Sequence, residues 1–154
     1  MNPDSGVSDE KVVLLVEDNY DHANMVIRVL RRQVLSKRVL HLTDGEAALD
    51  YLFRRGAYQS SASSPRPDVV LLDLRLPRLD GLEVLRAAKE CDALRDIPVV
   101  VMSSSAAASD MARAYRHHAN SYLVKPSDYF QFVQLLEIVS TYWLAHNRTT
   151  ARAG

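Results

Sequence analysis

The sequence predicts a doubly wound α/β fold: one domain in which five parallel strands form a single sheet covered by helices on both faces. Short apolar runs alternate with longer amphipathic stretches along the chain, which is typical of β-α-β units joined by right-handed crossovers. The chain has 154 residues, 47% of them apolar. That length suits one domain, because cores divide only beyond about 250 residues.

Five short segments are predicted strands. Residues 12–16, 69–72 and 99–102 are apolar without alternation, which is typical of a parallel strand covered on both faces. Residues 38–42 and 121–124 are more polar, so we expect them nearer the edges of the sheet.

Five segments with apolar residues at helical spacing are predicted helices. They are residues 22–34, 45–55, 82–91, 109–118 and 128–146. Asp128 is the expected N-cap of the last one, because its side chain can accept a hydrogen bond from a free backbone N–H group.

Polar segments flank and interrupt this pattern. Residues 1–10 and 147–154 are predicted disordered tails, and residues 11–146 form the domain. Residues 54–67 are rich in Gly, Ser and Pro and are predicted to form a long surface loop.

Composition excludes several classes of function. The 19 basic and 19 acidic residues balance, which argues against non-specific nucleic-acid binding. Each apolar run falls well short of the ~20 residues that span a bilayer. No signal peptide is visible at the N-terminus, and Cys91 has no second cysteine to pair with. We therefore expect a cytoplasmic protein with no membrane association.

Polar side chains follow the predicted strands where each one ends. Glu17 and Asp18 follow the first strand, Asp73 the third, Ser103 the fourth and Lys125 the fifth. Because parallel strands end at the same edge of a sheet, and ligands bind there, we expect these side chains to converge. One Asp after a strand is usually a turn residue or a helix cap; the joint occurrence favours a site.

Three converging carboxylates with no His or Cys ligand suit a hard cation such as Mg²⁺. With that charge masked, Asp73 could attack a phosphorus atom and form an aspartyl-phosphate. Lys125 would offer a positive charge to one phosphoryl oxygen, and Ser103 a hydroxyl donor to another.

Four segments together resemble the receiver domain of two-component response regulators. They are Glu17-Asp18, residues 73–77 with Asp80-Gly81, residues 98–103 and residues 122–126. The resemblance covers residues 11–146 and implies a flavodoxin-like receiver fold.

The resemblance assigns roles around the strand ends. It implies that Asp73 accepts a phosphoryl group from the phosphohistidine of a sensor histidine kinase. Asp18, Asp73 and the backbone carbonyl of Arg75 would bind Mg²⁺ directly, and Glu17 through water.

The remaining motif residues also receive roles by resemblance. Lys125 would contact the phosphoryl group, and a cis peptide would precede Pro126. Ser103 and Tyr122 would form a switch pair: the hydroxyl moves to the phosphoryl group and the aromatic ring turns inward. Such a change lets phosphorylation favour one of two conformations.

The sequence departs from the usual receiver pattern at several positions. Ser103 stands where threonine is commoner, and His118-Ala119-Asn120 replaces a smaller turn before the fifth strand. Arg75 and Ser105 occupy the two positions that border the phosphoryl group in this family, where side-chain identity influences the lifetime of the phosphate.

A narrower resemblance concerns the kinase that would supply the phosphoryl group. Residues 51–56 and the Ser-rich loop look like the stand-alone receivers paired with bacterial phytochromes, which implies a light-sensing kinase as phosphodonor. The receiver occupies nearly the whole sequence, so we expect an output through protein contacts, phosphate relay or phosphate buffering, and not a metabolic enzyme.

The last helix carries more apolar residues than one core-facing stripe needs. Between Tyr129 and Leu144 they occupy more than half of its circumference. Since surplus apolar surface tends to mark interaction sites, the sequence predicts a homodimer through this helix.

Three other functions are possible for a chain with this predicted sheet, and each would require features of its own. A Mg²⁺-dependent phosphatase or phosphotransferase on a similar sheet would need a second acid and a cap over its substrate. A flavodoxin-type FMN carrier would need a phosphate-binding loop after the first strand, where this sequence has Glu17-Asp18. A scaffold that acts without phosphorylation would not need the carboxylates of Glu17, Asp18 and Asp73.

Overall fold

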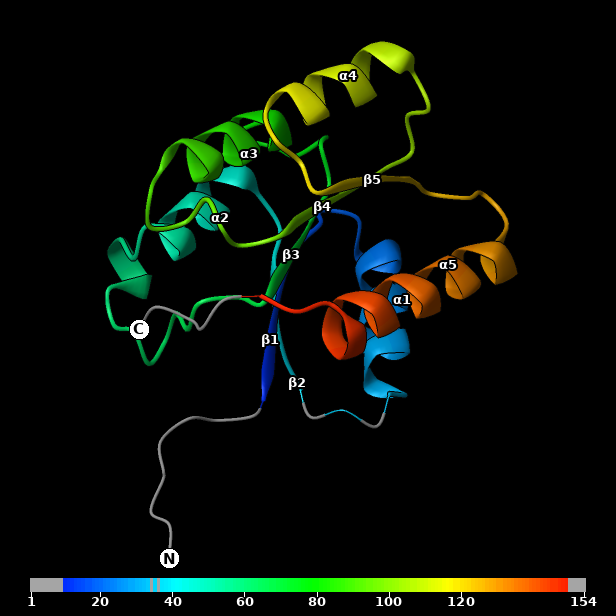
Figure 1. The fold of residues 1–154 in the computed structure, drawn as a ribbon, viewed down its shortest axis with the longest axis horizontal. Coiled ribbons are helices and arrows are strands. Elements are labelled where there is room, and N and C mark those ends of the chain that lie inside the picture. Colours follow the sequence, from blue (N-terminus) through cyan, green and yellow to red (C-terminus); the bar gives the residue numbers. More distant parts are fainter. Residues whose placement is uncertain (1–9, 34, 36, 150–154) are drawn as a thin grey trace, which may run out of the picture.

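The computed structural model describes residues 10–33, 35 and 37–149. Five parallel strands form one sheet in the order β2-β1-β3-β4-β5 (Figure 1). The strands are β1 (Lys11–Val16), β2 (Lys37–Leu42), β3 (Val69–Leu72), β4 (Val99–Ser103) and β5 (Ser121–Val124). The predicted doubly wound sheet is confirmed, and its strand order reverses between β1 and β3, where such folds bind ligands.

Helices cover both faces of this sheet. They are α1 (Tyr20–Arg31), α2 (Gly45–Leu52), α3 (Gly81–Glu90), α4 (Ala108–Arg116) and α5 (Tyr129–Thr141). Helices α1 and α5 lie on one face, and α2, α3 and α4 lie on the other (Figure 1). Each face therefore has its own apolar layer.

The central strands contribute to both layers. Leu14 and Leu72 pack with α2 and α3 on one side, while Leu15 and Leu71 pack with α1 and α5 on the other. All four side chains are buried. This two-sided burial explains why the sequence of a central strand shows no alternation.

Several helix ends differ from the predicted ones because of local hydrogen bonds. Helix α1 begins two residues early, since the side chain of Asn19 accepts from the N–H of His22 and caps it. Helix α2 ends at Leu52, three residues early, and Arg54 has a φ of 55°. A residue in that left-handed conformation cannot continue a right-handed helix. The predicted cap at Asp128 is confirmed.

The last predicted helix changes character before its end. Helix α5 stops at Thr141, and η2 (Tyr142–His146) continues as a π-helical turn. The hydroxyl of Ser140 donates to the carbonyls of Leu136 and Glu137. Back-bonding of this kind often bends helices, and here it lies directly before the change in winding.

The Gly-, Ser- and Pro-rich segment is more ordered than a surface loop. It contains the short 3₁₀ helix η1 (Gly56–Tyr58). The buried Ser64 hydroxyl donates to the carbonyl of Tyr58, and the Tyr51 hydroxyl donates to that of Pro65 at 2.6 Å. The Ser64 bond closes the segment on itself, and the Tyr51 bond fastens it to α2.

The predicted tails fall mostly outside the described residues. Residues 1–9 and 150–154 are not described, and residues 147–149 belong to no helix or strand. The described part of the chain contains no helix long and apolar enough to cross a membrane.

Candidate functional site

Backbone hydrogen bonds continue the sheet beyond its strands and fix the residues that follow them. Glu17 N–H donates to Leu42 at 3.0 Å, Asp73 N–H to Val16 at 3.0 Å, and Lys125 N–H to Ser103 at 2.7 Å. The three functional positions are therefore tied to neighbouring strands at one edge. The predicted convergence of these side chains is what the structure shows.

Three carboxylates meet at this edge. Glu17, Asp18 and Asp73 each offer an oxygen, and these atoms lie within 4.8 Å of one another. Glu17 and Asp73 are buried, whereas Asp18 is exposed. Repulsion between charges this close disfavours ionisation of all three unless a cation joins them.

The backbone of Asp73 can lie against Gly81 because Gly81 has no side chain. A Cβ atom on Gly81 would overlap the Asp73 carbonyl oxygen. The N–H of Gly81 donates to Leu74 at 2.8 Å, which closes the turn between β3 and α3.

Lys125 is the cation of the cluster. Its ammonium lies 2.6 Å from Glu17 and 3.0 Å from Asp73, and all three side chains are buried. One positive charge thus faces three carboxyl groups. Removing one partner from a buried group of this kind leaves an uncompensated charge and is costly.

The electrostatic imbalance is clearest at Glu17. Burial, together with the neighbouring Asp73, raises the pKa of this carboxyl from 4.5 to about 7, although Lys125 acts in the opposite direction. A buried acid with a raised pKa beside charge partners is typical of functional sites.

The donor set fits a hard divalent cation. All three ligand groups are carboxylates, which Mg²⁺ prefers to nitrogen or sulfur ligands. Exposed Asp18 leaves one side of the cluster open, as Mg²⁺ binding requires when the ion retains water ligands.

The cluster forms part of the wall of an open cleft of about 610 Å³. It is lined by Asp18, Asn19, His22, Asp73, Arg75, Ser103, Ser104, Ser105 and Lys125. Arg75 N–H donates to an Asp73 oxygen at 3.1 Å. The role of the Arg75 carbonyl as a metal ligand stays a prediction.

His22 belongs to the site although it was not predicted from the sequence. Its Nδ1 atom lies 3.1 Å from the Lys125 ammonium, and its ring packs on Phe132 with centroids 5.6 Å apart. Burial and the nearby Lys125 lower the pKa of His22, so a neutral ring accepts from lysine. Its position four residues after Asp18, in the capped first turn of α1, was the available signal.

The predicted switch residues are connected through one loop residue. Ser103 is buried, and its hydroxyl accepts from Ser105 N–H at 3.1 Å. Half-buried Tyr122 donates its hydroxyl to the Ser105 carbonyl at 2.9 Å. Ser103 lines the cleft, whereas Tyr122 packs against the apolar layer that Leu14 and Leu72 share with α2 and α3.

The predicted cis peptide before Pro126 is wrong for this structure, because the described residues contain no cis peptide bond. The Lys-Pro motif alone could not fix the isomer, since the two forms of such a bond differ by only about 0.5–1 kcal/mol.

Comparisons with known proteins show which family the chain belongs to. A family model described as the response regulator receiver domain matches residues 13–137. The probable methanogenesis regulatory protein FilR2 of Methanothrix harundinacea is 43% identical over 145 residues, covering 94% of this chain and 91% of that protein.

Two solved structures are similar throughout. The Mn²⁺-bound response regulator Rcp1 has a TM-score of 0.87 at 36% identity, with 92% of this chain and 99% of that chain covered; Rcp1 comes from a Synechocystis strain. The phosphorylated cyanobacterial phytochrome response regulator RcpA has a TM-score of 0.87 at 34% identity and the same coverage. The sheet, the acidic edge and these likenesses agree, and the chain belongs to the response regulator receiver domain family.

Proposed function

We propose that this chain accepts a phosphoryl group on Asp73 from the phosphohistidine of a sensor histidine kinase, with Mg²⁺ as cofactor. One observation carries the proposal: Asp73 lies in an open cleft, paired with Lys125 and within ligand distance of two further carboxylates. This is the arrangement that phosphoryl transfer to a carboxylate requires.

The chain's own residues would position the reacting groups. Hydrogen bonds from Arg75 N–H and Lys125 hold the two oxygens of Asp73, which limits rotation of the carboxylate. Lys125 and the Ser103 hydroxyl would then donate to phosphoryl oxygens. Mg²⁺ held by Asp18, Asp73, the Arg75 carbonyl and, through water, Glu17 would neutralise the charge brought together.

We further propose a phytochrome kinase as the phosphodonor and the cytoplasm as the location. The likeness to RcpA, a cyanobacterial phytochrome response regulator, supports the donor. The unpaired Cys91 suits a reducing compartment. The protein would be a substrate of phosphorylation and a signalling partner, with no metabolic turnover and no nucleic-acid ligand.

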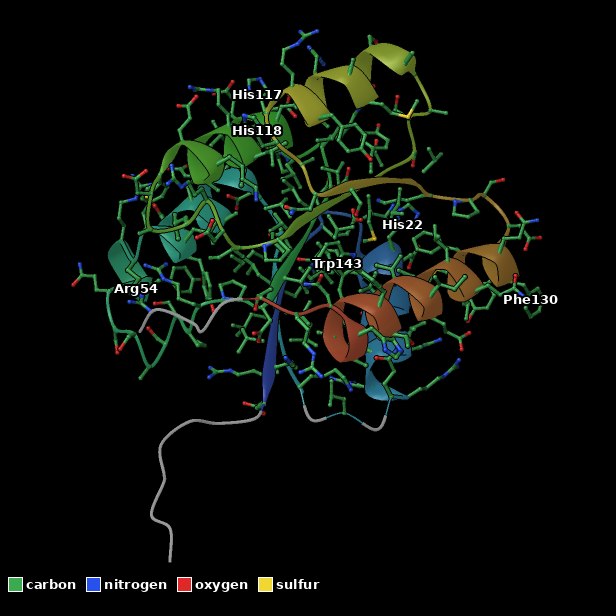
Figure 2. The ribbon with its side chains drawn as sticks, in the orientation of Figure 1. His22, Arg54, His117, His118, Phe130 and Trp143 are labelled. Atoms are coloured by element: carbon green, nitrogen blue, oxygen red, sulfur yellow. The ribbon has the colours of Figure 1, made fainter. Side chains whose placement is uncertain are left out.

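We also propose a homodimer through α5. Phe130 is 75% exposed and Ile138 67%, and Phe130 points away from the sheet (Figure 2). Tyr142, at 49% exposure, extends this apolar stripe into η2. A second copy of the chain would remove this surface from water.

Acetyl phosphate and Mg²⁺, followed by intact-mass analysis, test the central proposal. Wild type should gain one phosphoryl group, and Asp73→Asn should gain none. Asp80→Asn, which removes an exposed acid from the same β3–α3 turn, is the control and should be phosphorylated normally. Phosphorylation of Asp73→Asn, or steady release of phosphate without a phosphorylated protein, would contradict the proposal and favour a phosphatase.

A further inference from the structure

Both residues of the predicted switch pair bind the backbone of Ser105. Its N–H donates to the Ser103 hydroxyl oxygen at 3.1 Å, and its carbonyl accepts from the Tyr122 hydroxyl at 2.9 Å. The conformation of this one residue therefore sets the surroundings of Ser103 and Tyr122 together.

The bond to Ser103 has a chemical consequence. A serine hydroxyl has one proton and two acceptor lone pairs. Because the Ser105 N–H occupies an acceptor position of Ser103, the Ser103 proton stays available as a donor. Ser103 lines the cleft beside Asp73, so that proton can meet an oxygen of an incoming phosphoryl group.

The side chain of Ser105 is itself held in place from α4. Its hydroxyl donates to Asp110 at 2.5 Å and accepts from Ala107 N–H at 3.2 Å. Asp110 lies in the first turn of α4, its side chain only 15% exposed, and it also pairs with Arg113 at 3.2 Å. Asp110 thus links the helix to the loop that carries the switch contacts.

We infer that Asp110 is a positioning residue for phosphorylation: through Ser105 it holds Ser103 and Tyr122 in the arrangement that receives a phosphoryl group. This inference rests on the proposed function. Without the Asp110 carboxylate, the β4–α4 loop would sample other conformations, and ordering it again would weaken binding of the phosphoryl group.

A purely structural role makes a different prediction. Aspartate in a first turn also stabilises a helix through its dipole, and α4 has no side-chain cap at Ala107. If Asp110 acts only in this way, its removal would lower the melting temperature. The affinity for an anion and the environment of the Tyr122 ring would then be unchanged in the folded protein.

Calorimetric titration with beryllofluoride in saturating Mg²⁺ distinguishes the two roles. Asp110→Ala should weaken binding on the order of 3–10-fold, since preorganisation is lost. Ser105→Ala removes the same hydrogen bond and should also weaken binding. The Asp110 carboxylate lies 3.7 Å from Arg75 as well. The double variant should therefore bind no more weakly than Asp110→Ala alone, because that substitution already removes the contact with Ser105. Asp110→Asn, which keeps an acceptor oxygen, should restore most of the affinity.

Arg113→Ala supplies the matched control. It removes an ion-pair partner of Asp110 that lies three residues further along α4, and it should bind beryllofluoride like wild type. Ring resonances of Tyr122, followed by NMR without the anion, should shift in Asp110→Ala and not in Arg113→Ala.

The outcomes separate this inference from the proposed function. If wild type fails to bind beryllofluoride, the proposed function is wrong. If wild type binds but Asp110→Ala binds equally well with an unshifted Tyr122 ring, Asp110 only stabilises the helix and the inference is overturned.

Discussion

At the scale of single residues, the charge of Lys125 does not fully offset the repulsion among the carboxyl groups of Glu17, Asp18 and Asp73. Lys125 contacts both buried carboxyl groups, yet burial and Asp73 still raise the pKa of Glu17 to about 7. The folded protein thus favours either a proton or a cation at this position. Protonation and metal binding should therefore compete.

The raised pKa of Glu17 predicts how the stability of the metal-free protein depends on pH. Between the unfolded value of 4.5 and the folded value of about 7, the native state holds a proton that the unfolded chain has released. The free energy of unfolding should therefore fall as pH rises through this window. Below it the contribution is fully present, and above it the contribution is lost.

Urea unfolding between about pH 5 and pH 8 measures this effect. Glu17→Gln, which cannot ionise, should lose less stability than wild type over the range. Saturating Mg²⁺ should reverse the trend in wild type, because the metal binds the ionised carboxylate. Parallel pH profiles for wild type and Glu17→Gln would refute the assignment.

Residue positions after strands could be predicted because sheet geometry determines them. Glu17, Asp73 and Lys125 converge for that reason alone. His22 and Asp110 could not be placed in the same way. Their contacts depend on how α1 turns His22 toward Lys125 and how α4 turns Asp110 toward Ser105. The peptide before Pro126 was predicted wrongly because local sequence barely favours either isomer.

At the scale of elements, the turn between β3 and α3 connects the core to the site. Gly81 lies so close to the backbone of Asp73 and Leu74 that no side chain fits. Glycine is needed at this position for space and not for its conformational freedom, because the φ of Gly81 is not positive.

Gly81→Ala should therefore disturb both stability and the site. The added methyl group meets backbone atoms that cannot rotate away, so we expect a loss of about 1–3 kcal/mol in the free energy of unfolding and weaker Mg²⁺ binding. Gly56→Ala is the control: its φ of 56° strains any side chain, but nothing surrounds it. Gly56→Ala should lower stability and leave Mg²⁺ affinity at the wild-type level. If Gly81→Ala also binds Mg²⁺ as tightly as wild type, the turn does not position Asp73.

The surface of α5 makes a prediction of its own. Ile138→Lys places a charge on the exposed apolar stripe and should convert a dimer into a monomer, as measured by analytical ultracentrifugation. Gln59→Lys adds the same charge beside η1, where the residue is also exposed, and should leave the dimer intact. A wild type that is monomeric at micromolar concentration, with and without beryllofluoride, would exclude this interface.

The ends of elements were harder to predict than their cores. The Ser140 hydroxyl turns back onto the carbonyls of α5, and the predicted helix becomes a π-helical turn at Tyr142. Apolar spacing continues through this change, so periodicity alone could not reveal it.

At the scale of the whole molecule, the strand order explains why the site forms where it does. The chain winds from β1 to β2 on one side and returns to β3 on the other, which leaves the ends of β1 and β3 adjacent and uncovered. The residues that follow them are Glu17, Asp18 and Asp73. The overall fold could be predicted from apolar patterning because three central strands are buried on both faces.

Calorimetric titration of Mg²⁺ into the metal-free protein measures whether the three carboxylates form a cation site. We expect one ion bound per chain in wild type and a large loss of affinity in Asp18→Asn, with Asp80→Asn unchanged as the control. Absence of Mg²⁺ binding in wild type, or equal affinity in Asp18→Asn, would contradict a divalent cation site formed by the three carboxylates.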